Sequence, residues 1–230
     1  MLEGLKNEYV LISGISGSIG GSLASLLISK GFSVIGISRS APSKELKQKY
    51  SNVSWITYNS SSNDPDPIVS NKLKEILGHN ELVGVFHCAG SHSSGAPLNF
   101  TTKNYLESIE ANLFSAINII QLTLNLVSSG GSILVLNSQA AISPASNELV
   151  YGTSKRALSA YIDGMQIEAT KRGLQIVNVL CGAVQSDMAD GRPDFEKFIS
   201  LSELSEALYS LSTARKSFRF KDVEILRRCY

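Results

Sequence analysis

Short apolar runs alternate along this chain with longer segments whose apolar residues recur every three or four positions. Strand-length runs separated by helical segments are typical of repeated βαβ units, in which crossover helices join parallel strands. Seven runs have the length of a strand, at 9–13, 33–38, 53–58, 82–87, 132–137, 175–180 and, with the weakest pattern, 222–227. The sequence therefore predicts an α/β protein with a doubly wound, seven-stranded parallel sheet and helices on both faces.

The segments between these runs have the punctuation of helices. The longest helical pattern places one apolar stripe, which we expect to pack on the sheet, at Leu106, Ile109, Leu113, Ile117, Ile120, Leu124 and Val127. Left-handed glycines are expected to end several helices, at Gly31, Gly78, Gly130 and Gly173. The polar stretch 59–67 is expected to form a surface loop at a sheet edge.

Composition narrows the class of protein. The 230 residues are 43% hydrophobic and 18% charged, which predicts one globular domain over 1–230. A net charge of +1 and the lack of a basic cluster argue against nucleic acid as a partner, and no run is apolar enough to indicate a membrane partner. The three cysteines describe no disulfide framework, and no signal sequence is apparent, so we expect a cytoplasmic protein.

A glycine-rich turn follows the first predicted strand. It reads Ser13-Gly14-Ile15-Ser16-Gly17-Ser18-Ile19-Gly20, and a helix is predicted to begin near Ser18. Such a turn lets the backbone approach a pyrophosphate while free N–H groups at the helix start point at its charge. The candidate dinucleotide-binding residues here are Gly14, Ser16, Gly17, Ser18, Ile19 and Gly20, and the fold is expected to be Rossmann-like.

The second strand indicates which dinucleotide is preferred. It ends in Ser38-Arg39-Ser40 and has no carboxylate for a ribose 2′-hydroxyl, whereas Arg39 could pair with a 2′-phosphate. We therefore expect NADP(H) to be favoured over NAD(H); the alternative is that Arg39 is a solvated surface residue. Ala89 and Gly90, small residues after the fourth strand, would leave room for the cofactor.

The segment Tyr151-Gly152-Thr153-Ser154-Lys155 carries the strongest chemical signal. A spacing of four places the phenol and the ammonium on one helical face, with Cβ atoms about 5–6 Å apart. A free phenol, with a pKa of about 10, is a poor base at neutral pH, and a nearby cation would stabilise the phenolate. Tyr151 is thus the predicted general acid/base, and Ser138, after the fifth strand, would orient the same carbonyl.

Taken together, these motifs resemble the short-chain dehydrogenase/reductase family over most of the chain, from Tyr9 to about Met188. The resemblance implies an NAD(P)-dependent oxidoreductase acting on CH–OH or C=O groups. Its Tyr-x-x-x-Lys pair falls on Tyr151 and Lys155, which would also contact the cofactor, and its serine falls on Ser138. The family's catalytic asparagine falls on Asn112, which by resemblance would hold a water in a proton relay.

The resemblance also implies further cofactor contacts and shows departures from the family pattern. The segment after the sixth strand would supply Gly182, Val184 and Ser186. Ser18 stands at a usual glycine, where it would crowd the dinucleotide or bond a phosphate. Asn59 stands where the family often has an Asp beside the adenine. His87 replaces a frequent Asn, and Cys181 replaces the usual Pro.

Other functions fit the sequence less well than an oxidoreductase does. The main rival is a catalytically inactive cofactor-sensing or scaffold protein of the same fold, although the whole tetrad is retained. His87, Cys88 and His92 lie close together, but a fourth ligand with zinc-site spacing is absent, so no metal is expected. A serine hydrolase would need a Gly-x-Ser-x-Gly elbow, which the chain lacks.

The segment 189–200 is short for the region that sets substrate specificity in the family. We expect it to form a short lid over an accessible pocket, compatible with a small-molecule or carrier-bound carbonyl or alcohol substrate. By resemblance, the helices starting near Lys103 and Tyr151 would form a dimer face, so a homodimer or homotetramer is expected. Tetramer contacts made by a glycine-rich ending would be missing, because the tail lacks one.

Overall fold

The computed structural model describes residues 8–61, 64–213 and 217–228 and contains one seven-stranded parallel sheet. The strands lie in the order β3-β2-β1-β4-β5-β6-β7, and every neighbouring pair is parallel. Their bounds are β1 Glu8–Ser13, β2 Ser33–Ser38, β3 Val53–Thr57, β4 Glu81–His87, β5 Val127–Ser138, β6 Gln175–Cys181 and β7 Asp222–Ile225. The predicted doubly wound fold is confirmed, and all seven predicted strands are present.

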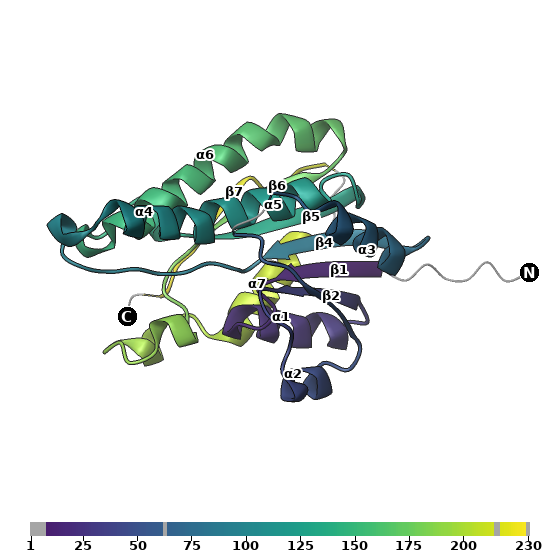
Figure 1. Cartoon of the computed structure of the whole chain (residues 1–230), viewed down its shortest axis with the longest axis horizontal. Coiled ribbons are helices and arrows are strands. Elements are labelled where there is room, and N and C mark those ends of the chain that lie inside the picture. The colour runs from purple at the N-terminus through teal and green to yellow at the C-terminus, as the bar shows by residue number, and fades with distance from the viewer. Residues whose placement is uncertain (1–7, 62–63, 214–216, 229–230) are drawn as a thin grey trace, which may run out of the picture.

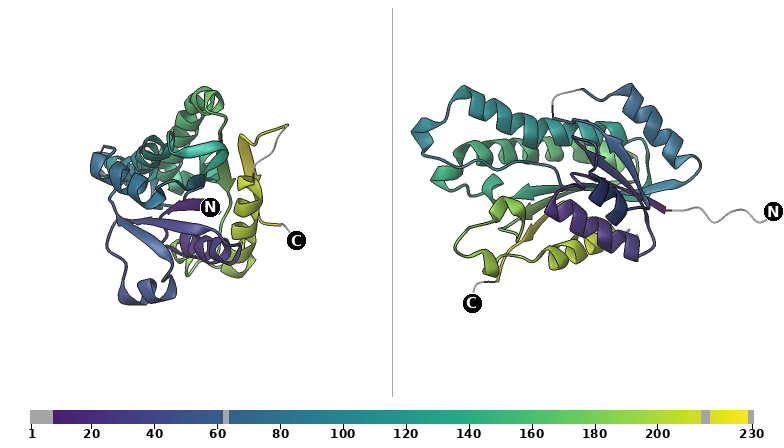
Figure 2. Two further views of the ribbon diagram at one scale, coloured as in Figure 1. Left: turned by 90° about the vertical axis from the view of Figure 1, so that its right-hand side faces the viewer. Right: turned by 60° about the horizontal axis from the view of Figure 1, so that its bottom comes forward.

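Helices cover both faces of this sheet. Figures 1 and 2 show α3, α4, α5 and α6 on one side and α1, α2 and α7 on the other. Their bounds are α1 Ser18–Ser29, α2 Lys44–Lys49, α3 Pro67–Leu77, α4 Thr102–Ile109, α5 Ser115–Thr123, α6 Leu149–Lys171 and α7 Leu201–Ser212. Within the described ranges, no helix has the length and apolar character needed to span a bilayer.

The core is divided by the sheet into two apolar layers. Strand residues alternate between them, so Leu11 of β1 packs in the layer that contains Leu158 of α6. Its neighbour Ile12 packs in the other layer, with Leu23 of α1 and Leu208 of α7. Because both faces of each central strand are buried, these strands are nearly continuous apolar runs, which is why the sequence marks them clearly.

The long predicted helix differs most from the sequence prediction. It is interrupted by a π-helical turn at Glu110–Phe114 between α4 and α5, and this turn carries Asn112. The interruption rotates α4 relative to the stripe, so Leu106 is 55% exposed and does not pack on the sheet. Val127, expected at the end of the helix, is instead the first residue of β5.

The predicted left-handed glycines are all observed, with φ of 93° at Gly31, 54° at Gly78, 86° at Gly130 and 69° at Gly173. Gly130 is the exception in its position, because it lies within the irregular start of β5 and not at a helix end. The pairing register of β4 with β5 shifts in this region, between Leu82 and Gly84.

The order of the strands positions the candidate site. From β1 the chain first builds the sheet outward through β2 and β3, and from β4 it builds in the opposite direction. Ligands of such sheets bind at this switch point, beyond the carboxyl ends of the strands. Here those ends carry the glycine turn after β1, Ala89 and Gly90 after β4, Ser138 at the end of β5 and Cys181 at the end of β6.

Two glycines make the turn after β1 possible. Gly14 has a φ of 81°, and a Cβ added there would lie 2.7 Å from the backbone nitrogen of Ala89. A Cβ added at Gly20 would lie 2.3 Å from the carbonyl oxygen of Gly14. The third glycine, Gly17, is less constrained, because an added Cβ would meet only ordinary contact at 3.5 Å.

We predict that Gly20→Ala lowers the free energy of unfolding by about 2 kcal/mol or more, since the added methyl group must push the turn backbone aside. Gly17→Ala is the matched control and is expected to cost about 1 kcal/mol or less, the usual price of alanine at a helix N-cap. Denaturant unfolding of the protein without cofactor measures both. Equal losses would show that the Gly14–Gly20 contact does not constrain the fold.

Candidate active site

A continuous cleft runs along the carboxyl edge of the sheet. It consists of a cavity of about 420 Å³ over the glycine turn and a cavity of about 300 Å³ over the N-terminal end of α6. The two are joined, since both are lined by Ile19, Cys88, Ala89, Gly90, Ser91, Ser186 and Met188. We call them the turn cavity and the catalytic cavity.

The turn cavity has the features of an anion site. All six predicted turn residues line it: Gly14, Ser16, Gly17, Ser18, Ile19 and Gly20. Helix α1 begins here with Gly17 at the N-cap, which supplies no side-chain cap, and no acidic residue lies in its first turn. The free N–H groups and the helix dipole at this end favour a negatively charged group.

Arg39 lines the same cavity at the end of β2. Its guanidinium forms no ion pair or hydrogen bond with any residue that the structure describes. An unpaired cation at the far end of the turn cavity can accept a second anionic group.

Of two predicted cofactor contacts, Ser18 lines the turn cavity and Asn59 does not. The Ser18 hydroxyl accepts a hydrogen bond from the backbone N–H of Asp187 at 3.1 Å, so it ties the turn to the loop after β6. Asn59 is exposed and lies outside the cavity lining, whereas Tyr58 and Ser60 on either side of it line the cavity and are buried. The extended backbone after β3 alternates its side chains, and this turns Asn59 outward.

The catalytic cavity brings together Asn112, Ser138, Tyr151 and Lys155 from the π-turn, the end of β5 and α6. Ala89 and Gly90 after β4, and Gly182, Val184 and Ser186 after β6, line it as well. The predicted site residues other than Asn59 therefore lie along one cleft.

Lys155 is buried beneath the cavity. Its side chain is 4% exposed, and its Nζ donates to the carbonyl oxygen of Leu136 at 3.2 Å and lies 5.8 Å from the ring centroid of Tyr151. Burial lowers the pKa of Lys155 to about 8, with a small opposing effect from Cys88. Desolvation therefore disfavours the charged form of Lys155.

The pKa of Tyr151 is raised in the protein by itself. Burial is the main cause; hydrogen bonding with Ser138 lowers the pKa, whereas Glu148 and Cys181 raise it further. Desolvation of the phenolate is therefore the dominant effect on the pKa of Tyr151. At neutral pH the Tyr151 hydroxyl is protonated and is a proton donor.

Asn112 is fully buried, and protein groups occupy its amide. Its Oδ1 accepts the backbone N–H of Ser91 at 3.0 Å, and its Nδ2 donates to the Ser91 carbonyl at 3.0 Å and to the hydroxyls of Ser108 at 3.2 Å and Ser154 at 3.1 Å. A Cβ on Gly90 would lie 2.8 Å from Asn112 Oδ1. Asn112 thus fixes the loop after β4 against α6, and the water it was expected to hold remains a prediction.

The pair formed by His92 and Glu148 in this cavity was not predicted from the sequence. His92 Nε2 and Glu148 Oε1 are 3.0 Å apart, and the His92 ring meets the Tyr151 ring edge to face at 4.9 Å between centroids. Glu148 precedes Tyr151 by one helical turn, which is the signal that could have placed it near the phenol. Nothing in the sequence pairs it with His92.

The histidines and cysteines of this region do not converge on a metal site: among the described residues there is no group of three or more His, Cys, Asp or Glu side chains that could hold an ion. His87 Nε2 lies 3.3 Å from the Ser115 hydroxyl, and burial, aided by Lys155, lowers the pKa of His87 to about 3. Cys88 and Cys181 are free thiols whose pKa values burial raises to about 12. Cys229 lies outside the described residues.

Comparison with known proteins decides the family. The model of the short chain dehydrogenase family matches residues 8–197. The chain belongs to the short-chain dehydrogenase family. It is therefore a short-chain oxidoreductase that acts on CH–OH or C=O groups, and the family binds a nicotinamide cofactor.

Curated members of the family are similar along most of the chain. The NADPH-dependent 1-acyldihydroxyacetone phosphate reductase of Saccharomyces cerevisiae is 27% identical over 94% of this chain and 74% of its own length. The dihydropteridine reductase of Dictyostelium discoideum is 24% identical over 90% of this chain and 88% of its own length.

Solved structures of the family share the fold. A short-chain dehydrogenase/reductase from Serratia marcescens superposes with a TM-score of 0.82 at 20% identity, covering 97% of this chain and 98% of that one. The alcohol dehydrogenase from Thermococcus sibiricus, solved with 5-hydroxy-NADP, gives a TM-score of 0.82 at 22% identity, covering 95% and 96%.

We predict that Lys155→Met raises the free energy of unfolding at pH 7 by roughly 1–3 kcal/mol, because it removes a buried ammonium whose pKa lies near 8 instead of 10.5. The sign follows from proton binding. Between about pH 8 and 10.5 the unfolded chain holds a proton on Lys155 that the folded chain has lost, so the stability of the wild type rises there. The difference between variant and wild type should therefore shrink from pH 7 to pH 10.

Denaturant unfolding at both pH values provides the measurement. Lys171→Met, which removes a lysine that is 67% exposed, is the control and should change the stability by about 0.5 kcal/mol or less at either pH. A lower stability of Lys155→Met at pH 7 would mean that the ammonium is better solvated than its burial indicates.

Proposed function

We propose that this chain reduces a carbonyl with NADPH and that Tyr151 donates the proton. The observation that carries the proposal is the meeting of Tyr151, Ser138 and Lys155 in one cavity, where the raised pKa of Tyr151 keeps the phenol protonated at neutral pH. A protonated phenol suits the reductive direction, in which the carbonyl oxygen must receive a proton. It is a poor base for the reverse oxidation.

The residues of the turn cavity fit the cofactor. The close packing of Gly14 and Gly20 leaves the backbone bare, the start of α1 offers uncapped N–H groups, and Arg39 is an unpaired cation. The bare backbone and the start of α1 would hold the pyrophosphate of NADPH, and Arg39 would hold its 2′-phosphate. In the catalytic cavity Gly182, Val184 and Ser186 would hold the nicotinamide end, with Tyr151 and Lys155 beside it.

The bound reduced nicotinamide would supply the hydride that adds to the carbonyl carbon. Tyr151 would release its hydroxyl proton to the carbonyl oxygen, so the C=O bond becomes CH–OH. Ser138, which hydrogen-bonds with Tyr151, would orient that oxygen. Lys155, buried one helical turn away, would stabilise the phenolate left on Tyr151 until it is protonated again.

The relatives support the choice of direction and cofactor. The yeast relative is named as an NADPH-dependent reductase, and so is the 3-dehydrocapnine reductase of Ornithobacterium rhinotracheale, which is 21% identical over 79% of this chain. A cytoplasmic location, a homodimer or homotetramer and a lid at 189–200 stay predictions from the sequence.

We predict that Tyr151→Phe lowers kcat for NADPH oxidation with a responsive ketone by about 100-fold or more, since the proton donor is lost and the ring is kept. The Kd for NADPH, measured by quenching of protein fluorescence or by calorimetry, should change little. A panel of ketones and quinones with the wild type identifies a responsive substrate. Unchanged turnover by the Phe variant would exclude Tyr151 as the donor.

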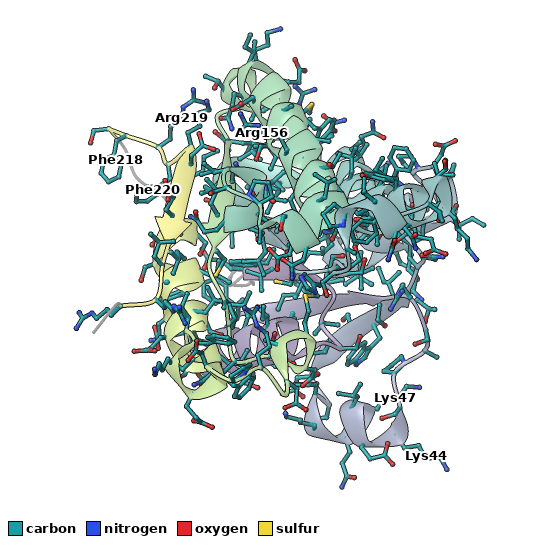
Figure 3. All side chains as sticks on the ribbon, turned by 90° about the vertical axis from the view of Figure 1, so that its left-hand side faces the viewer. Lys44, Lys47, Arg156, Phe218, Arg219 and Phe220 are labelled. Carbon is teal, nitrogen blue, oxygen red and sulfur yellow. The ribbon has the colours of Figure 1, made fainter. Side chains whose placement is uncertain are left out.

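We predict that Arg39→Ala raises the Kd for NADPH about tenfold and leaves the Kd for NADH unchanged, because the guanidinium would contact the 2′-phosphate alone. Lys47→Ala is the matched control. Figure 3 shows Lys47 projecting from α2, and it is not among the residues that line the turn cavity. Equal affinities for the two cofactors in both wild type and variant would remove the assigned role of Arg39.

A further inference from the structure

The catalytic cavity continues into a third cavity that the proposed chemistry does not use. This third cavity has a volume of about 420 Å³, and Ala183 and Arg192 line both it and the catalytic cavity. Its other lining residues are Pro193, Asp194, Phe198 and Arg227. We call it the arginine cavity. In Figures 1 and 2 the segment before α7 lies beside the C-terminal end of the chain, which brings Arg227 to this place.

Two guanidinium groups are held over one ring in the arginine cavity. The Cζ atoms of Arg192 and Arg227 lie 4.9 Å and 5.9 Å from the ring centroid of Phe198. Phe198 is 6% exposed, so the ring is a fixed support for both cations. Stacking uses the flat face of a guanidinium and leaves its N–H edge available for a planar or tetrahedral anion.

The charges in this cavity do not cancel. Asp194 is its acidic residue, and its carboxylate lies 3.9 Å from Arg227 and 3.6 Å from Lys197. Arg192 is different: across the described ranges its guanidinium has no ion pair and no hydrogen bond, only the contact with Phe198. The cation nearest to the catalytic cavity is thus the one that lacks a counter-ion.

Tyr151 and Arg192 line the same catalytic cavity. Many of its other lining side chains are small or aliphatic, among them Leu136, Ala140, Ala145, Val184, Met188 and Ala189. Its remaining charged side chains lie elsewhere: Lys155 is buried beneath Tyr151, and Glu148 is paired with His92. A ligand in this cavity can therefore contact the Tyr151 hydroxyl, aliphatic side chains and an unpaired arginine.

We infer that the arginine cavity binds the anionic end of the substrate, a carboxylate or phosphate separated by an aliphatic segment from the carbonyl that Tyr151 protonates. The inference rests on the proposed function, since it names the substrate class of the same site. Arg192 is the specificity-determining residue. Arg227 assists it less, because it is shared with Asp194.

Two pairs of probes test this assignment, each pair differing in one charged group. The first pair is 7-oxooctanoate and its methyl ester; the second is dihydroxyacetone phosphate and dihydroxyacetone. The proteins are the wild type, Arg192→Gln, Arg192→Lys and, as a control that removes one positive charge from the far end of α6, Lys171→Gln. Steady-state NADPH oxidation gives KM and kcat for each combination.

Arg192→Gln is expected to raise KM for at least one anionic probe about tenfold, the effect of losing a charged hydrogen bond, and to leave KM for its neutral partner unchanged. Arg192→Lys should recover part of the loss, and Lys171→Gln should behave like the wild type. The two pairs show whether the preferred anion is a carboxylate or a phosphate. Equal effects of Arg192→Gln on anionic and neutral probes would overturn the proposal.

A binding measurement separates this inference from the proposed function. Octanoate and methyl octanoate have no reducible ketone, so their affinities, measured by calorimetry with NADPH present, do not depend on turnover. Octanoate binding that weakens about tenfold in Arg192→Gln supports the anion site even if no ketone is reduced. If ketones are reduced, but neither octanoate binding nor KM for dihydroxyacetone phosphate differs between wild type and Arg192→Gln, the anion site is refuted and the reductase function stands.

Discussion

The burial of one ammonium group shapes the electrostatics around Tyr151. Lys155 is held under the cavity by the carbonyl oxygen of Leu136 at 3.2 Å, where water no longer stabilises its charge. Its pKa falls for that reason, and its field contributes to the lowered pKa of His87. Burial of its own phenol raises the pKa of Tyr151. The Tyr151 phenol and the His87 imidazole are therefore uncharged at neutral pH near the Lys155 ammonium.

Much of the fold could be predicted because its signals are local. The central strands, such as β2 at Ser33–Ser38, are buried on both faces and so appear as apolar runs, and left-handed glycines separate them from the helices. The π-turn at Glu110–Phe114 has no such signal. Its residue Asn112 hydrogen-bonds with Ser91 and Ser154, which are distant in the chain. The periodicity therefore predicted one straight helix where the structure has two.

The candidate site divides in the same way. The one-turn spacing of Tyr151 and Lys155 and the bare backbone around Gly14 are properties of short segments, and the sequence sufficed to place them in one cleft. The pKa of Tyr151 is raised mainly by burial, which cannot be predicted from the spacing of two residues. The pairing of His92 with Glu148 and the outward turn of Asn59 likewise depend on the three-dimensional path of loops.

The hydrogen bond from the Asp187 backbone to Ser18 joins segments that are 169 residues apart in the chain. It connects the two rims of the turn cavity, and Asp187 begins the stretch that leads through Ala189 to Arg192. A displacement of the glycine turn would therefore be transmitted to the segment after β6. Through this contact, parts of the wall that come from opposite ends of the sequence behave as one mechanical unit.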